Sequence, residues 1–201
     1  MMPTETTTTA RRSRLSESRE REIYGVVEDL LRQDGYEALT MDQIAAASHA
    51  SKATLYRRWN TKAELVITAI RMRRPMLTRD IDTGTLAGDL LTLVRDAGAR
   101  LNEEAPLLRG LGQAMHQNPD LLRAFRDQVM LPERAGLEVL LRRAEARGEL
   151  PEGSAGSTEV VYMLLGAVIG RPILEEKDPD TDFLVRFTHQ VILPSLRLTP
   201  R

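Results

Sequence analysis

The chain has 201 residues, a formal net charge of −1 and 42% hydrophobic residues, which suffices for one sizeable core or a small module joined to a larger one. It contains no cysteine, which excludes a disulfide framework, a thiol nucleophile and a cysteine-ligated zinc site. Its first residues lack the apolar stretch of a secretion signal, and its longest apolar run, residues 160–170, is too short to span a membrane, so we expect a cytoplasmic protein.

The charges are unevenly distributed along the chain. Residues 1–75 carry 13 Lys and Arg against 10 Asp and Glu, whereas residues 76–201 carry 15 against 19. The basic part is therefore the N-terminal one. Residues 1–15 are rich in threonine, include three arginines and offer little to bury, so we expect a disordered arm. Such an arm either keeps the chain in solution or reaches nucleic acid.

A helical pattern begins at Ser16. Apolar residues then recur with the 3.6-residue period of one helix face: Ile23, Val26, Val27, Leu30 and Leu31. Asp34-Gly35 is expected to end this helix, with Gly35 in the left-handed conformation.

Three further helices are predicted before Pro75. Thr40 and Gln43 form a capping box that begins a short helix, and Ser48-His49-Ala50 forms a turn. Ser51 then caps a second short helix over residues 52–58. Thr61-Lys62-Ala63-Glu64 is a second capping box, which begins a longer helix that Pro75 limits.

The rest of the chain shows no alternation typical of strands, and apolar periodicity separated by Pro, Gly and Asp predicts more helices. Their expected ranges are Thr85–Leu101, Ala105–His116, Pro119–Arg147, Ser157–Gly170 and Asp182–Leu193. The fold class is all-α, with about nine helices. We expect the disordered arm at 1–15, a helix-turn-helix module at 16–75 and a helical effector-binding and dimerisation domain at 76–201.

The pair of short helices indicates DNA binding. A short exposed helix fits the major groove, and Leu55 is placed to point into the core while its neighbours face outward. Arg57 and Arg58 can bind guanine or phosphate, and Tyr56 offers a hydroxyl or a ring face. The alternative is a solvated cationic helix pair. A helix this short is barely stable by itself, which favours a docking role.

The stretch GYEALTMDQIAAASHASKATLYRRWNTKAELV resembles the DNA-binding module of the TetR/AcrR family of repressors. The resemblance covers about residues 18–70. The residues that carry it are Gly35, Thr40, Ile44, Ala45, Ser51, Thr54, Leu55, Tyr56, Trp59, Lys62 and Leu65. Residues 76–201 resemble the divergent ligand-binding region of the family only in helical character and length.

The resemblance implies a set of DNA-binding positions, with Ser51, Thr54 and Lys62 mainly at phosphates. Together with the capping-box pair, the candidates are Thr40, Gln43, Ser51, Lys52, Ala53, Thr54, Tyr56, Arg57, Arg58 and Lys62. The turn departs from the family pattern, since His49-Ala50 stands where Gly-Val is usual. Histidine tolerates a positive φ better than most residues, so we expect the same turn with slightly lower stability.

The resemblance also implies a homodimer on a near-palindromic operator, released from DNA by a small molecule of unknown identity. Residues 160–169 are apolar nearly all round, which fits a dimer interface or, alternatively, an ordinary core. Candidate interface residues are Val161, Leu165, Gly166, Ile169, Phe183, Phe187 and Val191. Candidate pocket residues, which core packing would also explain, are Leu111, Met115, His116, Phe125, Met130, Tyr162, Met163 and Arg171.

The sequence thus favours a DNA-binding transcriptional regulator, most simply a repressor released by a ligand. The alternative is a helix-turn-helix activator or DNA binder that has no effector. An enzyme is disfavoured because no nucleophile motif, phosphate-binding loop or metal-ligand spacing is present. No cofactor, metal or membrane partner is expected.

Overall fold

The computed structural model describes residues 16–154 and 159–197, and within those ranges it contains helices and no strand. This confirms the all-α fold class. The helices are α1 (Glu17–Ala38), α2 (Met41–Ala47), α3 (Lys52–Arg58), α4 (Lys62–Met72), α5 (Leu86–Glu103), α6 (Ala105–Gln117), α7 (Pro119–Phe125), α8 (Leu131–Ala146), α9 (Glu159–Glu175), α10 (Thr181–Phe187) and α11 (Leu193–Ser195), with π-helical segments at Arg126–Met130 and Thr188–Ile192. Because the π segments are continuous with their neighbours, these residues form nine helical runs. The predicted arm at 1–15 lies outside the described residues.

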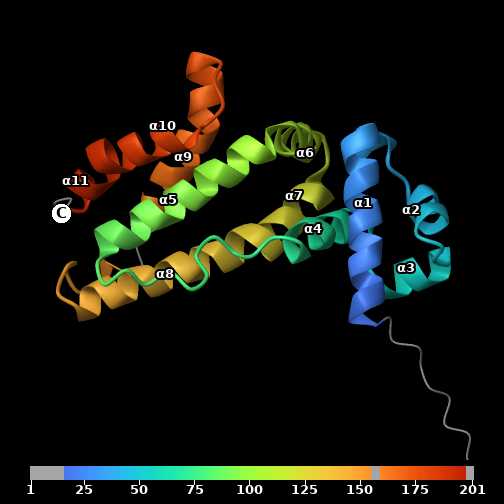
Figure 1. Cartoon of the computed structure of the whole chain (residues 1–201), viewed down its shortest axis with the longest axis horizontal. Coiled ribbons are helices and arrows are strands. Elements are labelled where there is room, and N and C mark those ends of the chain that lie inside the picture. The colour runs from blue at the N-terminus through green and yellow to red at the C-terminus, as the bar shows by residue number, and fades with distance from the viewer. Residues whose placement is uncertain (1–15, 155–158, 198–201) are drawn as a thin grey trace, which may run out of the picture.

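The molecule has two lobes joined at α4 and α6 (Figure 1). One lobe holds α1 with the short helices α2 and α3. In the other, α5 and the continuous run from α7 to α8 lie lengthwise, and α9 and α10 cover α5. The C-terminal end of the chain lies at the far end of this second lobe.

The first lobe follows from local signals in the sequence. The hydroxyl of Ser16 accepts a hydrogen bond from the Arg19 backbone N–H and caps α1. Gly35 has φ 74° and breaks the helical geometry as expected, but one further turn follows before the chain leaves α1 at Leu39. The capping box of Thr40 and Gln43 is confirmed, with both reciprocal hydrogen bonds present.

The second capping box is only half formed. Thr61 accepts from the Glu64 backbone N–H, as predicted. The Glu64 carboxylate, however, accepts from the backbone N–H of Asn60 at 2.9 Å, one residue before the expected donor. Two hydrogen bonds therefore hold the start of α4. The Thr61 hydroxyl accepts one from Glu64, and the Glu64 carboxylate accepts the other from Asn60.

The core does not divide at Pro75. One apolar cluster joins α1 to α4 of the first lobe with Leu107, Leu111, Ala114 and Leu121 of α6 and α7. Two other clusters lie within the second lobe, between α5, α8, α9 and α10. The boundary predicted at 75/76 falls in the connection that precedes α5, while the packing of the first lobe continues across it.

Both π segments have the same cause. Each ends two residues before a proline, Pro132 in one run and Pro194 in the other. Proline has no N–H to donate and its ring crowds the carbonyl four residues earlier, so the preceding turn widens without interrupting the helix. This explains why the predicted helix over 119–147 remains continuous.

The predicted end of the next helix at Gly170 is wrong. Helix α9 continues through Pro172 to Glu175, and its predicted first residue, Ser157, lies outside the described residues. At Pro172 the helix loses one hydrogen bond and the ring crowds the carbonyl of residue 168, but the helix continues. Arg171 and Glu175, one turn apart, form an ion pair at 3.6 Å along this last turn.

Candidate nucleic-acid interface

The turn between α2 and α3 has a defined geometry. The His49 N–H donates to the Ala46 carbonyl at 3.2 Å, and the Ala50 N–H donates to the Ala45 carbonyl at 3.0 Å. These are the two hydrogen bonds of a Schellman motif, in which the residue after the cap has a positive φ. His49 has φ 49°, so it occupies the position where glycine is usual. The expectation that histidine would adopt this conformation is confirmed.

The core side of α3 fixes how the helix faces outward. Leu55 is fully buried, and Trp59 just after the helix is almost fully buried. The Trp59 ring packs edge-on against Tyr24 of α1, with ring centroids 5.7 Å apart. Burial raises the pKa of Tyr24 to about 12, assisted by the neighbouring Glu20 carboxylate. Helix α3 is thus anchored at its middle by Leu55 and just after its C-terminal end by Trp59.

The opposite side of α3 is exposed and carries the candidate DNA-binding residues. Tyr56 is 44% exposed, and Arg57 is exposed beside it. No hydrogen bond or ion pair joins either side chain to another of the described residues. Ala53, also exposed, leaves space next to them. This face therefore offers one uncommitted guanidinium and one uncommitted phenol to a ligand.

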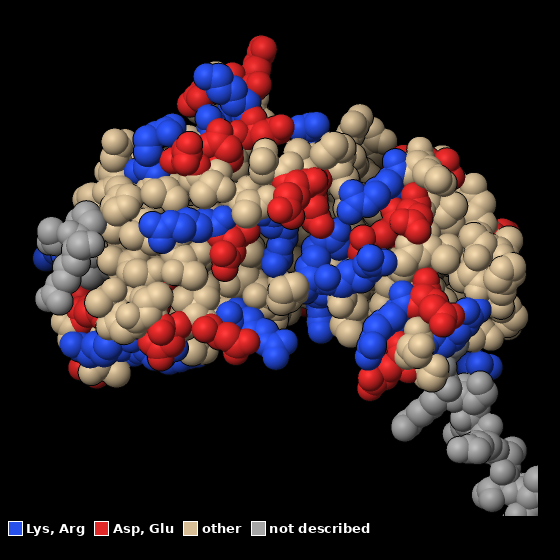
Figure 2. Space-filling model, in the orientation of Figure 1, with Lys and Arg blue, Asp and Glu red and all other residues tan. Residues whose placement is uncertain are grey.

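Two other cations of α3 are paired with acids from neighbouring helices. The Lys52 ammonium lies within 3.0 Å of both carboxylate oxygens of Asp42 in α2. The Arg58 Nε donates to Glu20 of α1 at 2.7 Å. These hydrogen bonds raise the pKa of both cations. Around α3, basic and acidic side chains accordingly alternate on the surface (Figure 2).

The hydroxyl and amide candidates are engaged in caps. Thr40 and Gln43 bind one another in the capping box at the start of α2. Ser51 accepts from the Thr54 backbone N–H at 3.0 Å, and the two hydroxyl oxygens lie 2.7 Å apart. These side chains cap the two short helices. A phosphate that contacted the Thr40 or Ser51 hydroxyl would therefore share it with a capping hydrogen bond.

Lys62, expected at a phosphate, has an internal position. Its Nζ donates to the carbonyls of Tyr36 and Leu39 at 2.8 and 2.9 Å, and it lies 4.1 Å from the centroid of the Tyr36 ring. Desolvation lowers the pKa of Lys62. Carbonyls at the end of a helix lack internal partners and attract a cation, which explains the position. Lys62 thus ties the start of α4 to the end of α1.

The predicted pocket residues are not brought together. Leu111, Met115 and Phe125 pack in the cluster shared with the first lobe, whereas Met163 packs in the second lobe. The others lie apart: His116 and Tyr162 are exposed, Met130 is half-buried, and Arg171 is paired with Asp180 at 3.0 Å. Helical periodicity identified faces that are buried, but could not tell which core each face enters.

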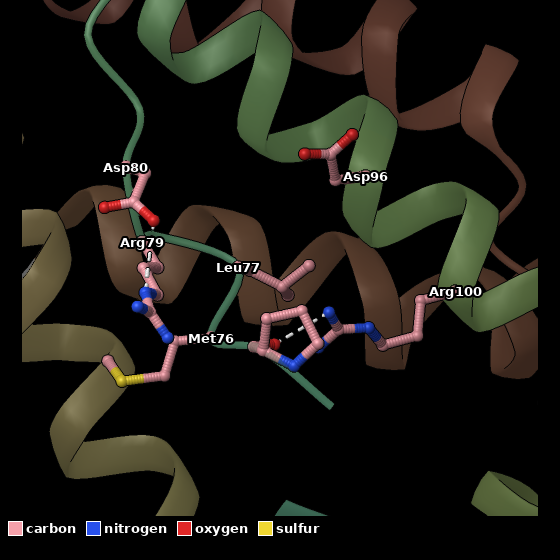
Figure 3. A pocket seen from close by; sticks show the side chains of 7 residues that line it. Met76, Leu77, Arg79, Asp80, Asp96 and Arg100 are labelled. Carbon is pink, nitrogen blue, oxygen red and sulfur yellow. Dashed lines mark hydrogen bonds and ion pairs between the residues drawn. The ribbon is translucent and has the colours of Figure 1, made fainter. Parts of the chain in front are cut away.

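A hollow of about 370 Å³ lies elsewhere, between the segment that follows α4 and the middle of α5 (Figure 3). Its lining is mixed in charge and apolar character. The lining residues are Pro75, Met76, Leu77, Arg79, Asp80, Asp96 and Arg100. None of the eight predicted pocket residues is among them.

The predicted dimer residues divide into two groups. Val161, Phe183 and Phe187 pack inside the subunit, because they face the clusters beneath α9 and α10. Leu165 is half-buried, while Gly166, Ile169 and Val191 are exposed. The exposed members of α9 continue as an apolar stripe that also includes Tyr162, Gly170, Ile173 and Leu174.

Comparisons with known proteins agree with this geometry. Residues 27–69 match the family model described as bacterial regulatory proteins of the tetR family, and residues 80–191 match the tetracyclin repressor-like C-terminal domain. The chain belongs to the TetR family. An uncharacterized HTH-type transcriptional regulator of Mycobacterium tuberculosis is 35% identical over 178 residues, which cover 89% of this chain and 88% of the relative.

Two further TetR-type proteins are similar over nearly their whole length. The DNA-binding transcriptional repressor TetR of Mycobacteroides abscessus is 30% identical over 183 residues, covering 90% of this chain and 95% of the relative. The crystal structure of TetR family transcription regulator SCO0332 has a TM-score of 0.70 at 26% identity, covering 92% of this chain and all of that one. This TetR-family protein is therefore a DNA-binding transcriptional regulator.

Sequence reasoning missed the acidic partners of the interface. Asp42 and Glu20 were not singled out, although each pairs with a cation of α3, which we call the reading helix. No local signal pairs Glu20 with Arg58, because they are 38 residues apart.

Among the described helices, none combines the length and apolar character that a membrane span requires.

Proposed function

We propose that this TetR-family regulator is a repressor that binds a near-palindromic operator as a homodimer and leaves DNA when a small molecule binds. The observation that carries the DNA-binding part is the exposed face of α3, where Tyr56 and Arg57 have no partner among the described residues while Leu55 anchors the opposite side. The repressor assignment is supported by the relative named as a repressor. Such a protein acts in the cytoplasm, where its operator lies.

The proposed contacts follow from how each side chain is engaged. Arg57 is free to bind guanine or phosphate bidentately, and Tyr56 to contact phosphate or a thymine methyl. Lys52 reaches a phosphate by exchanging its exposed pairing with Asp42, which costs little because exposed ion pairs contribute little to stability. Lys62 supports the module from inside.

The remaining candidates have secondary roles in this proposal. The N-terminal hydroxyls of α2 and α3, on Thr40 and Ser51, order the backbone N–H groups of those helices. Such N–H groups are suitable donors to phosphate. A dimer with six to eight phosphate contacts should show a log–log salt slope of about −5 to −7.

A second copy of the chain is the proposed partner of α9. The stripe on α9 is apolar and exposed, with Tyr162 at 69% and Ile169 at 61% exposure. Gly166 and Gly170 lie within it, and no atom of the subunit stands within 4 Å of a Cβ built at either. Small residues at this spacing let a second helix approach closely. Val191, which follows α10, is also exposed.

Ligand release is the part of the proposal that needs its own experiment. Purified protein is screened by thermal shift against a compound collection, and each stabilising compound is then tested for release of the protein from its operator. A compound that does both supports a ligand-released repressor, because a ligand can shift the equilibrium only by its differential affinity. If compounds stabilise the protein without any effect on DNA binding, the alternative of an effector-free DNA binder or activator is favoured. We propose no catalytic activity.

A further inference from the structure

The junction between the two lobes contains a charged bridge built on Arg74, just after α4. One guanidinium nitrogen of Arg74 donates to Glu28 of α1 at 2.8 Å, and its Nε donates to both oxygens of Glu104 at 2.7 and 2.6 Å. The same side chain donates to the Ile70 carbonyl of α4 at 3.0 Å. Glu104 lies between α5 and α6. One side chain therefore touches the DNA-binding lobe, the connecting helix and the second lobe.

A second arginine, on α5, also binds the segment that connects α4 to α5. Arg100, one turn before Glu104 on α5, donates to the Pro75 carbonyl at 2.8 Å (Figure 3). Arg74 thus reaches from the connecting segment to α5, while Arg100 reaches from α5 back to the connecting segment. Two consecutive residues of the connection, Arg74 and Pro75, are fixed to one face of α5.

The DNA-binding lobe is shaped to receive this cluster. The Glu28 carboxylate is buried and also lies 3.6 Å from Arg73. A Cβ at Gly25, one turn earlier on α1, would stand 3.0 Å from the Arg73 guanidinium. Glycine therefore leaves this space open to the end of the Arg73 side chain. Side chains of both signs crowd this junction on the surface (Figure 2).

The chemistry of the bridge specifies geometry more than stability. Arg74 and Glu104 are mostly buried and Glu28 is almost fully so, so the cost of removing these charges from water offsets much of their attraction. Burial alone disfavours the Arg74 cation, but its hydrogen bonds to Glu104 and Glu28 outweigh that effect and raise its pKa. A buried guanidinium that satisfies two carboxylates tolerates few alternative positions.

We propose that the Arg74 bridge, formed with Glu28 and Glu104, is the latch that sets the angle of the DNA-binding lobe relative to the second lobe. The proposal rests on the proposed function, because it names how a change in the second lobe reaches α3. When Glu104 and Arg100 hold the connection, the reading helix has one orientation. When α5 shifts, the latch opens and the orientation spreads over many angles.

The test measures the angle directly and does not require DNA. Because the chain has no cysteine, labels can be placed at Ala46→Cys in α2 and Ala146→Cys in α8, both exposed. Pulsed electron paramagnetic resonance then gives the intrachain distance, with labelled chains diluted in excess unlabelled chain. Glu104→Ala cuts the bridge on the second-lobe side and leaves the pairing of Arg74 with Glu28 intact. Arg109→Ala is the control, since it removes an exposed pairing with Asp178 that involves none of Arg74, Glu28 and Glu104.

The latch predicts one narrow distance distribution in the unmutated and Arg109→Ala proteins and a broad one in Glu104→Ala. If about one molecule in ten then keeps the competent angle, apparent DNA affinity falls about tenfold. A Glu104→Ala protein with an unchanged distribution would overturn the proposal, even if its melting temperature fell. The more conservative Glu104→Gln variant is measured in the same way if the alanine variant does not fold. If the distribution broadens while no DNA sequence is bound, the latch stands and the proposed repressor function fails.

Discussion

The ammonium nitrogen of Lys52 lies within 3.0 Å of both carboxylate oxygens of Asp42, and both side chains are exposed on the face that we propose meets DNA. The acid competes with phosphate for the lysine and repels the DNA backbone. It therefore limits the affinity of the reading helix.

Asp42→Asn should strengthen operator binding. The gain per subunit should be modest, because the Lys52–Asp42 pair is exposed and exposed ion pairs are weak. The gain should shrink with added salt because the contact is electrostatic. Fluorescence anisotropy with labelled operator measures both effects. Glu152→Gln, which makes the same charge change in the second lobe, should leave binding unchanged. Weaker binding by Asp42→Asn would show that the acid itself contacts DNA.

His49→Gly should stabilise the protein by roughly 0.5–1 kcal/mol. At φ 49° a non-glycine residue destabilises the fold by about 1–2 kcal/mol. Glycine avoids this strain, but its greater backbone entropy in the unfolded chain offsets part of the gain. Urea unfolding followed by circular dichroism measures the difference. Because His49 makes no hydrogen bond with its side chain among the described residues, operator affinity should stay within twofold. A destabilised glycine variant would contradict the geometry of this turn.

If the protein forms the proposed α9 dimer, Gly166→Leu should convert it to monomers without harming the subunit. No atom lies within 4 Å of a Cβ at Gly166, and leucine has a higher helix propensity than glycine. The added side chain blocks only a helix that approaches from outside. Light scattering coupled to size exclusion gives the mass. Gly110→Leu is the matched control, since its Cβ also meets open space, on α6. If both variants remain dimers, the interface lies elsewhere.

Asp180 should make stability dependent on pH in acid. Its pKa lies below the ordinary value of 3.8, first because the Arg171 guanidinium is paired with it at 3.0 Å and then because the Phe183 backbone N–H donates to it. The stabilisation is complete above the ordinary pKa and is lost as pH falls through the lowered one. Asp180→Asn should thus melt lower than the unmutated protein at pH 7, with the difference shrinking as the pH falls below 3.8. A difference that is constant with pH would show that the charge of Asp180 is irrelevant.

Local patterns in the sequence were sufficient for the DNA-binding lobe. The hydroxyl residues Thr40, Ser51 and Thr61 begin the three helices after α1, because an N-cap is decided within four residues. The positive φ of His49 also follows from its place between two such helices. Even so, Lys62 was assigned to phosphate, since its two carbonyl partners lie more than 20 residues away.

The second lobe was predicted less well for a related reason. Apolar periodicity identifies which residues are buried, but Leu111 and Met163 enter different cores, and no local signal distinguishes them. The helix expected to end at Gly170 continues through Pro172 to Glu175, because proline disfavours a helix without always ending it. The Arg74 bridge joins residues 30 and 46 positions apart and is visible only in three dimensions.

The central claim is that α3 reads the operator through its uncommitted side chains. It is tested most directly by selecting binding sites from a random DNA pool with the unmutated protein and with Arg57→Ala. The account predicts enrichment of a near-palindrome by the unmutated protein and, on that sequence, binding weaker by about 1–3 kcal/mol per arginine removed. Identical sites and equal affinities for the two proteins would contradict it.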